Sequence, residues 1–359
     1  MKGKITRIEV YRLNIPLKAP VTIAIGTISE ARNILVKIIT EEGTYGLGEG
    51  APFWMIVGET QDSCLATARD FARLLLGRYV WDIEGNVRLM ENYLTRNFTC
   101  KSAFDMALYD AAAKLTGMPL YQFLGGGRKT IVTDETIYLG TPEAIAEDAI
   151  GIRERGANAI KVKLGKEPDE DIRRIRAIRE AIGEGLPLRV DANQGWDYVS
   201  AVKVLKAIAP YGVEYCEQPV KHWDIDGMAR VRANSPIPIC ADESLFTHID
   251  ALQLVQKQAV DYFNIKLSKS GGIHTALKIN AIAEAAGIPC MIGCMSESRL
   301  GITANAHLAA ARSNIIFYDL DSPFEHAVDP VVGGAIYRDH YHLDLPDTPG
   351  HGADFGAEF

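Results

Sequence analysis

Short apolar runs recur at nearly constant spacing between residues 126 and 324, and this pattern limits the fold more than any other feature of the chain. Each run has the length of a strand, and an amphipathic helical pattern follows. Strand and helix patterns that alternate in this way predict a (β/α) barrel. The eight runs are TIYLG (136–140), AIKVKLG (159–165), PLRVDAN (187–193), VEYCEQP (213–219), PICADES (238–244), YFNIKLS (262–268), PCMIGCM (289–295) and IIFYDLD (315–321).

A charged or reactive residue lies at the end of each run from the second to the eighth, at intervals of 24 to 28 positions. In a barrel, the carboxyl ends of the strands open onto one mouth, where barrel enzymes hold their active sites. The sequence therefore predicts an active site at this mouth. The residues are Lys163, Asp191, Glu217, Asp242, Lys266, Cys294 and Asp319.

Residues 1–125 have a different pattern. Period-two alternation predicts strands over 5–17 and 32–43, and apolar helical periodicity predicts helices over 64–76 and 103–116, which stop at glycines. Strands followed by helices indicate a small α+β domain. We expect the GGGRK segment after it to lead into the barrel domain, 126–324, and a turn-rich tail, 325–359, to pack back on the first domain.

The composition excludes several classes of function. A net charge of −8 disfavours nucleic acid as a partner. The chain has six cysteines without a CxxC pair, no signal-peptide pattern and no apolar run near the ~18 residues of a membrane span, so we expect a reduced, cytoplasmic protein that makes no membrane contact. A homo-oligomer is compatible with the sequence, which leaves the oligomeric state open.

Asp191, Glu217 and Asp242 end three adjacent predicted strands. Three unpaired carboxylates at one place would repel each other, and a divalent cation removes this conflict. Ligands that are all oxygen favour a hard ion such as Mg²⁺. The alternative is that each acid caps the following helix. Asn193 and Glu243 lie beside the three acids in the sequence.

Two lysines, Lys161 and Lys163, share the inward face of the second strand by alternation. A neighbouring ammonium and a nearby cation disfavour protonation, so Lys163 is a candidate general base. Lys266 lies four strands away, half of the circumference, and would face Lys163 across the mouth. Such opposed bases suit racemisation or epimerisation; the alternative is ion pairing with the carboxylates. We expect Lys269 to face solvent or the next loop.

Asp319 and Asp321 share a face at the end of the eighth strand, apart from the three metal-binding candidates. Their position predicts a counter-charge for a cationic group of the substrate; the alternative is one helix cap and one surface acid. Cys294 is interpreted as barrel lining. The GLGEG segment at 46–50 lacks the spacing of a dinucleotide-binding loop.

The motifs IKVKLG, RVDANQGWD, EYCEQP, CADES and NIKLSKSGGI resemble those of the muconate-lactonizing subgroup of the enolase superfamily, over nearly the whole chain. The resemblance implies an α+β capping domain over a modified (β/α)₇β barrel. It implies one Mg²⁺ held by Asp191, Glu217 and Asp242. Lys163 and Lys266 would be the acid/base pair, with Lys161 tuning Lys163, and the common step is abstraction of a proton α to a carboxylate.

Within this subgroup, the YDLDSP segment resembles the Asp-x-Asp motif of dipeptide epimerases, in which the two acids, here Asp319 and Asp321, hold the substrate ammonium. Thr136 matches a first-strand threonine of the same group. The resemblance therefore implies a dipeptide substrate. Muconate cycloisomerase, o-succinylbenzoate synthase and N-succinylamino-acid racemase are the alternatives within the subgroup, and their acidic substrates would be repelled by these two aspartates.

One departure concerns the second residue of the dipeptide. Epimerases of the L-Ala-D/L-Glu type carry an arginine in the first cap loop, and Gly26 stands at about that place here. Apolar residues surround it in the sequence, and the second cap loop carries Phe53 and Trp54. We therefore expect an uncharged or hydrophobic second residue. Met295, Ser296 and Ser298, after the seventh strand, are expected to complete the pocket.

Overall fold

The computed structural model describes residues 2–356, and its centre is a curled sheet of eight parallel strands. The strands follow in sequence order, β5 to β12, and every neighbouring pair is parallel. The backbone N–H of Asp134 donates to the carbonyl of Tyr318 at 3.2 Å, which joins the first and last strands. The strands are β5 (Glu135–Ile137), β6 (Ile160–Lys163), β7 (Leu188–Asp191), β8 (Val213–Glu217), β9 (Ile239–Ala241), β10 (Tyr262–Ile265), β11 (Cys290–Ile292) and β12 (Ile315–Tyr318).

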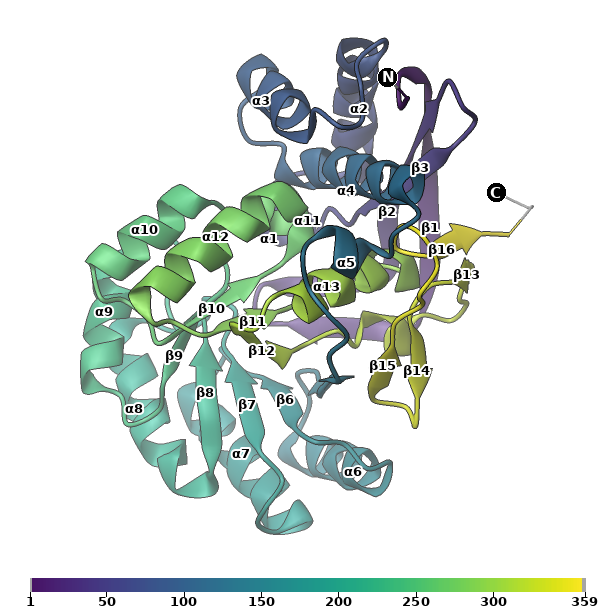
Figure 1. Ribbon diagram of the computed structural model, residues 1–359. Coiled ribbons are helices and arrows are strands. Elements are labelled where there is room, and N and C mark those ends of the chain that lie inside the picture. Colours follow the sequence, from purple (N-terminus) through teal and green to yellow (C-terminus); the bar gives the residue numbers. More distant parts are fainter. Residues whose placement is uncertain (1, 357–359) are drawn as a thin grey trace.

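Helices surround these strands on the outside, as Figure 1 shows. An α-helix follows each strand from β5 to β11, whereas the 3₁₀ helix η2 (Ser322–Glu325) follows β12. This order confirms the expected (β/α)₇β barrel. The helices are α6 (Pro142–Glu154), α7 (Pro168–Ile182), α8 (Tyr198–Ile208), η1 (Ala209–Tyr211), α9 (Ile225–Asn234), α10 (His248–Gln256), α11 (Leu267–Ser270), α12 (Ile273–Ala286) and α13 (Arg299–Ala311).

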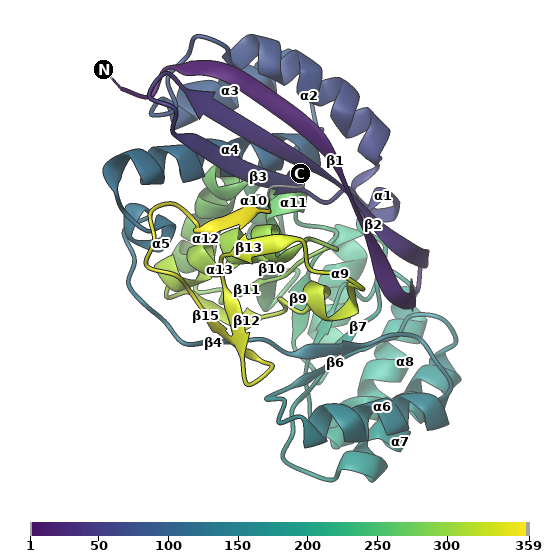
Figure 2. The ribbon, with the colours of Figure 1, turned by 90° about the vertical axis from the view of Figure 1, so that its right-hand side faces the viewer.

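The N-terminal domain carries an antiparallel sheet of order β1-β2-β3: β1 (Ile5–Ile23), β2 (Gly26–Thr40) and β3 (Tyr45–Gly50). The long β1–β2 hairpin extends beyond the cap helices (Figure 2). The stretch expected as a first cap loop is the tip of this hairpin, because the pair Val21 and Ile28 continues the ladder and is buried. The tip reaches the barrel, where the N–H of Leu139 donates to the carbonyl of Thr22 at 3.1 Å.

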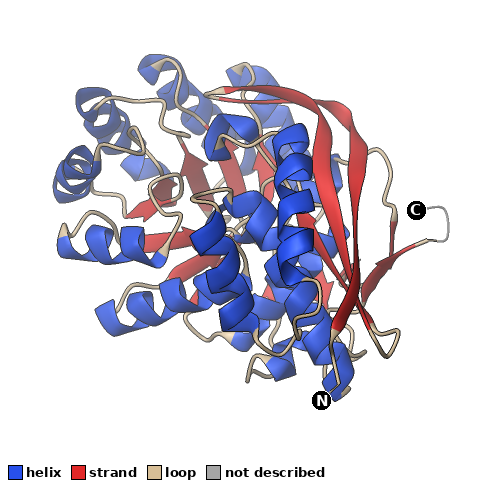
Figure 3. Ribbon diagram, turned by 90° about the horizontal axis from the view of Figure 1, so that it is seen from above, coloured by secondary structure: helices blue, strands red, loops and turns tan. Residues whose placement is uncertain are grey.

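Five helices complete this domain, more than the two expected: α1 (Trp54–Val57), α2 (Gln61–Leu75), α3 (Ile83–Tyr93), α4 (Phe98–Thr116) and α5 (Leu120–Phe123). Figure 3 shows the helices and strands of both domains together from above. Close packing of α4 on β3 explains two glycines of the GLGEG segment. A Cβ atom at Gly46 or Gly48 would lie 2.0 Å from a backbone carbonyl oxygen of α4.

The tail forms short strands that contact both domains. β13 (Val331–Gly333) pairs with β16 (Ala353–Phe355), and β14 (Ile336–Arg338) and β15 (His342–Asp344) extend a sheet with β4 (Ile131–Val132). The His351 N–H donates to Asp110 Oδ1 of α4 at 2.9 Å, and His351 Nε2 lies 3.0 Å from the carbonyl oxygen of Leu47. The division of the chain at residues 125 and 325 stays a prediction.

Within residues 2–356, none of the helices combines the length and the apolar character needed to cross a membrane.

Candidate active site

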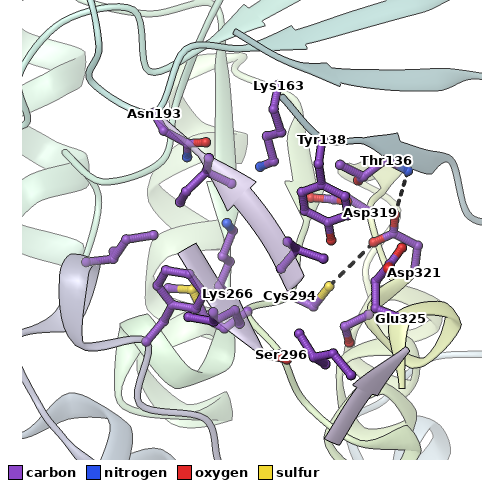
Figure 4. Close-up of a pocket in the computed structure, with 18 residues that line it drawn as sticks. Thr136, Tyr138, Lys163, Asn193, Lys266, Cys294, Ser296, Asp319, Asp321 and Glu325 are labelled. Atoms are coloured by element: carbon purple, nitrogen blue, oxygen red, sulfur yellow. Dashed lines mark hydrogen bonds between the residues drawn. The ribbon is translucent and has the colours of Figure 1, made fainter. Parts of the chain in front are cut away.

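A cavity lies between the barrel mouth and the tip of the β1–β2 hairpin. Figure 4 shows its labelled residues, most of which lie at or just after the carboxyl ends of barrel strands. The lining consists of Leu17, Val21, Ile23, Ile28, Phe53, Ile56, Thr136, Tyr138, Lys163, Asn193, Lys266, Cys294, Met295, Ser296, Asp319, Asp321, Ser322 and Glu325.

Asp191, Glu217 and Asp242 meet at the base of the barrel mouth. All three are fully buried, and an oxygen atom of each lies within 4.8 Å of the others. Parallel register produces this arrangement, because Asp191 pairs directly with Glu217 on the adjacent strand. Burial, together with the nearby Asp191, raises the pKa of Glu217 to about 7. Three buried carboxylates and no softer ligand are a donor set that fits a hard divalent cation.

Four lysines neutralise these carboxylates in the structure. Lys163 Nζ lies 2.7 Å from Asp191 Oδ2, and Lys266 Nζ lies 2.8 Å from Asp242 Oδ2. Both lysines also line the cavity (Figure 4). The structure therefore brings them beside the three carboxylates and exposes them to a ligand. A cation bound to the same oxygens would compete with the two ammonium groups and favour neutral lysine.

Lys269 contradicts the sequence prediction of a solvent-facing side chain. It is fully buried, and its Nζ lies 2.5 Å from Asp242 Oδ1 and 3.0 Å from the carbonyl oxygen of Asn264. The short helix α11 after β10 turns the side chain back under the strand ends. Burial disfavours the charged carboxylate, but Lys266 and Lys269 outweigh it and hold the pKa of Asp242 well below its usual range.

Lys161 contacts both the group of three carboxylates and Asp319, which we had expected to lie apart from that group. Its Nζ lies 2.8 Å from Glu217 Oε2 and 2.7 Å from Asp319 Oδ2. Burial opposes the charge of Lys161, but Asp319 and Glu217 outweigh burial and raise its pKa well above the usual value. Lys161 is therefore a fixed positive charge, and it does not line the cavity.

Asp319 and Asp321 line another part of the cavity wall, within 4.8 Å of each other and of the Cys294 sulfur. The Thr136 N–H donates to Asp321 Oδ2 at 2.7 Å, so Thr136 positions this carboxylate through its backbone. Burial and the neighbouring Asp319 raise the pKa of Asp321 well above its usual value. A cation that entered here would stabilise the ionised form of Asp321.

Apolar side chains of the cap cover the cavity, among them Val21, Ile23 and Ile28 of the hairpin. Gly26 lies at the hairpin tip but does not line the cavity. A Cβ atom at Gly26 would lie 2.0 Å from the sulfur of Met55, so Met55 of α1 fills the space beside this glycine. A longer side chain at Gly26 would have to displace Met55.

The loop after β11 supplies Met295 and Ser296 to the cavity wall, whereas Ser298 lies outside it. Ser298 is fully buried and caps α13. Glu49 of the GLGEG segment accepts hydrogen bonds from the Ser298 N–H at 2.8 Å, from the Gly301 N–H at 3.0 Å and from Asn33 Nδ2 at 2.7 Å. Asn33 Nδ2 also donates to the carbonyl of Ser296 at 2.8 Å. The cap thereby anchors this loop of the barrel.

Sequence reasoning did not identify Tyr138, Ser322 and Glu325 as cavity residues, although all three line it. Tyr138 follows Thr136 by two positions, directly after β5, so alternation could have indicated it. Ser322 and Glu325 belong to η2, whose path after the last strand has no simple sequence signal. Cys294 also lines the cavity, beyond its expected role in the barrel lining.

Fold and site together define a barrel enzyme of the enolase type, with lysines beside a cluster of carboxylates that fits a divalent cation. Residues 6–125 match the family model described as mandelate racemase / muconate lactonizing enzyme, N-terminal domain, and residues 144–358 match the one described as enolase C-terminal domain-like. The chain belongs to the mandelate racemase / muconate lactonizing enzyme family of the enolase superfamily.

Several relatives in this family are epimerases of dipeptides. A D-Ala-D/L-Ala epimerase of Cytophaga hutchinsonii is 42% identical and matches over 99% of this chain and 97% of its own. A hydrophobic dipeptide epimerase of Enterococcus faecalis is 44% identical over 97% of this chain and 99% of its own. An L-Ala-D/L-Glu epimerase of Clostridium acetobutylicum is 41% identical over 97% and 98%. The relatives thus act on different dipeptides.

A solved structure of a dipeptide epimerase from Cytophaga hutchinsonii, complexed with Mg and the dipeptide D-Ala-L-Val, is similar to the present one. The TM-score is 0.98 at 42% identity, covering 99% of this chain and 97% of that one. The likeness therefore extends over the cap, the barrel and the tail.

Proposed function

We propose that this protein is a Mg²⁺-dependent dipeptide epimerase that inverts the α-carbon of the second residue. One observation carries the proposal: a single cavity holds two lysines beside a cluster of three carboxylates and, at another place in its wall, two further aspartates. A dipeptide has a carboxylate at one end and an ammonium at the other. Similarity to three epimerases that act on dipeptides supports the same reaction class.

Asp191, Glu217 and Asp242 would hold the Mg²⁺, because they are buried, close together and offer only oxygen ligands. When bound, the ion supplies electrostatic stabilisation for charge that develops on the substrate carboxylate. Lys161 adds a fixed positive charge behind Glu217, at 2.8 Å. Lys269 does the same behind Asp242, at 2.5 Å. These lysines keep the carboxylates oriented.

Lys163 and Lys266 would move the protons. For one isomer, neutral Lys163 accepts the proton from the α-carbon, and the electron pair of the broken C–H bond moves into the adjoining carboxyl group. Lys266, as an ammonium, then donates a proton to the opposite face, and the electron pair returns to form the new C–H bond. The reverse order serves the other isomer, so the reaction needs no external oxidant or reductant.

Asp319 and Asp321 would bind the free ammonium of the first residue. A buried, charge-assisted contact of this kind favours a free dipeptide over an N-acylated amino acid, which lacks the ammonium. The same pair disfavours the acidic substrates of muconate cycloisomerase, o-succinylbenzoate synthase and N-succinylamino-acid racemase. We infer that the second residue is uncharged or hydrophobic, because the hairpin side of the cavity is formed by aliphatic and aromatic side chains.

A screen of dipeptide libraries in D₂O, followed by mass spectrometry, tests this proposal. We expect one deuterium to enter at the α-carbon of the second residue, together with formation of the epimer, and we expect apolar second residues to react fastest. Exchange of N-succinylamino acids without exchange of any dipeptide would contradict the proposal and favour the racemase reaction instead.

A further inference from the structure

Glu325 is a carboxylate of the cavity wall to which the proposed reaction gives no role. It ends the 3₁₀ helix η2, which begins directly after Asp321. Figure 4 shows Glu325 on the same side of the cavity as Asp321. The side chain therefore belongs to the end of the cavity where we place the first residue of the dipeptide.

Glu325 differs from the other two carboxylates at this end of the cavity, each of which has a hydrogen-bond partner. Asp319 accepts from Lys161 at 2.7 Å, and Asp321 accepts from the Thr136 N–H at 2.7 Å. Glu325 makes neither an ion pair nor a side-chain hydrogen bond with any of the residues between 2 and 356. Lys18 is the nearby base, and its ammonium donates to the carbonyl of Phe324, at 2.5 Å.

This unpaired carboxylate is also partly withdrawn from water. Burial raises the pKa of Glu325, and Lys18 opposes this only in part. A half-buried acid without a partner costs free energy that a cationic ligand would recover. Leu17 lines the same cavity and offers an apolar surface along which an aliphatic stem can lie.

We propose that Glu325 binds the side-chain cation of a basic first residue, so that the preferred substrates are Lys- or Arg-containing dipeptides with an apolar second residue. The inference rests on the proposed function. With the α-ammonium held by Asp319 and Asp321, the side chain of the first residue starts beside Asp321. Glu325 follows Asp321 by four positions and faces the same cavity, so a long basic side chain meets a carboxylate that has no ion-pair or side-chain hydrogen-bond partner among residues 2–356.

The experiment compares kcat/KM for Lys-Leu, norleucine-Leu and Ala-Leu, with wild type and with Glu325→Gln. Norleucine is close to lysine in shape and lacks its ammonium. A charge-assisted hydrogen bond is worth about 1.5–3 kcal/mol, so we expect wild type to prefer Lys-Leu over norleucine-Leu by about 10–150-fold. Glu325→Gln should reduce this ratio to near one. The control Glu143→Gln removes the same charge from the exposed first turn of α6 and should keep the wild-type ratio.

Wild type alone decides the matter if Glu325→Gln does not fold. Equal kcat/KM for Lys-Leu and norleucine-Leu would overturn the inference, and so would faster turnover of Gln-Leu than of Lys-Leu, which would indicate a neutral polar first residue. Turnover of Ala-Leu without any preference for Lys-Leu defeats only this inference. Absence of α-proton exchange with all of these dipeptides defeats the proposed function as well.

Discussion

The two walls of the cavity differ in polarity. The barrel wall is charged, and its lysines and carboxylates are joined by contacts such as 2.7 Å between Lys163 and Asp191 and 2.8 Å between Lys266 and Asp242. The cap wall is apolar and is formed by the tip of a hairpin, with Val21 and Ile28 paired across it. Under the proposed function, the reacting groups and those that bind the first residue of the dipeptide lie on the barrel wall, whereas the side chains that would contact the second residue lie on an extended hairpin.

Several hydrogen bonds cross between the cap and the barrel, and those of Glu49 bear on the cavity wall. Glu49, on the cap strand β3, accepts hydrogen bonds from the Ser298 and Gly301 N–H groups at the start of α13. It thereby fixes the preceding loop, which carries Met295 and Ser296. The cap therefore shapes part of the barrel wall in addition to covering it. The comparison leads to four predictions, three for the barrel wall and one for the cap.

Removal of the metal should have the largest effect. Chelation with EDTA should abolish turnover, and Mg²⁺ should restore it, because the ion would stabilise the charge that develops on the substrate carboxylate. Asp242→Asn should lower the affinity for Mg²⁺, measured by titration calorimetry. Full activity after exhaustive chelation would remove the metal from the mechanism.

Loss of one lysine should have the next largest effect. Lys266→Ala should lower epimerisation by about 10²–10⁴-fold, the usual contribution of one general acid or base. Exchange of the α-proton with D₂O should survive for one isomer only, since Lys163 still serves one face. Lys257→Ala, at an exposed lysine paired with Asp226, is the matched control. Unchanged epimerisation in the Lys266 variant would exclude two-base transfer.

Asp321→Asn should weaken kcat/KM for free dipeptides by about 10–150-fold, the range expected for one charge-assisted hydrogen bond. Binding of Mg²⁺ should be retained, because Asp321 lies outside the three carboxylates that form the metal site. Wild type should reject an N-acetylated dipeptide, and the variant should discriminate less between the two. Equal turnover of both substrates by wild type would contradict the ammonium role.

A change in the cap should have the smallest effect and should leave the chemistry intact. Ile28→Val removes one buried CH₂ group, worth about 0.8 kcal/mol, or about fourfold in kcat/KM for a leucine second residue. The ratio of α-proton exchange to epimerisation should stay that of wild type. A changed ratio would show that the hairpin takes part in proton transfer. It would contradict the assignment of proton transfer to the barrel wall alone.

Much of the barrel was predictable from the sequence because local signals and global fold agree there. Buried parallel strands are continuous apolar runs, so all eight could be located. The ends of these runs indicated which residues would meet, and Lys163, Asp191 and Glu217 do lie side by side in register. The cap was less predictable. The helix α3 was missed, although Asp82 is a good N-cap that accepts from the Gly85 N–H at 3.1 Å.

Periodicity, strand-end chemistry and the motif set were thus determined by the sequence alone, because each depends on residues that are close in the chain. The partners of the charged groups were decided only by the tertiary structure. Lys269 lies under Asp242, Lys161 joins Glu217 to Asp319, and Glu325 faces the cavity unpaired among the described residues. Such pairings depend on how distant segments pack. Packing therefore determines which buried charged groups pair within the protein and which remain available to a ligand.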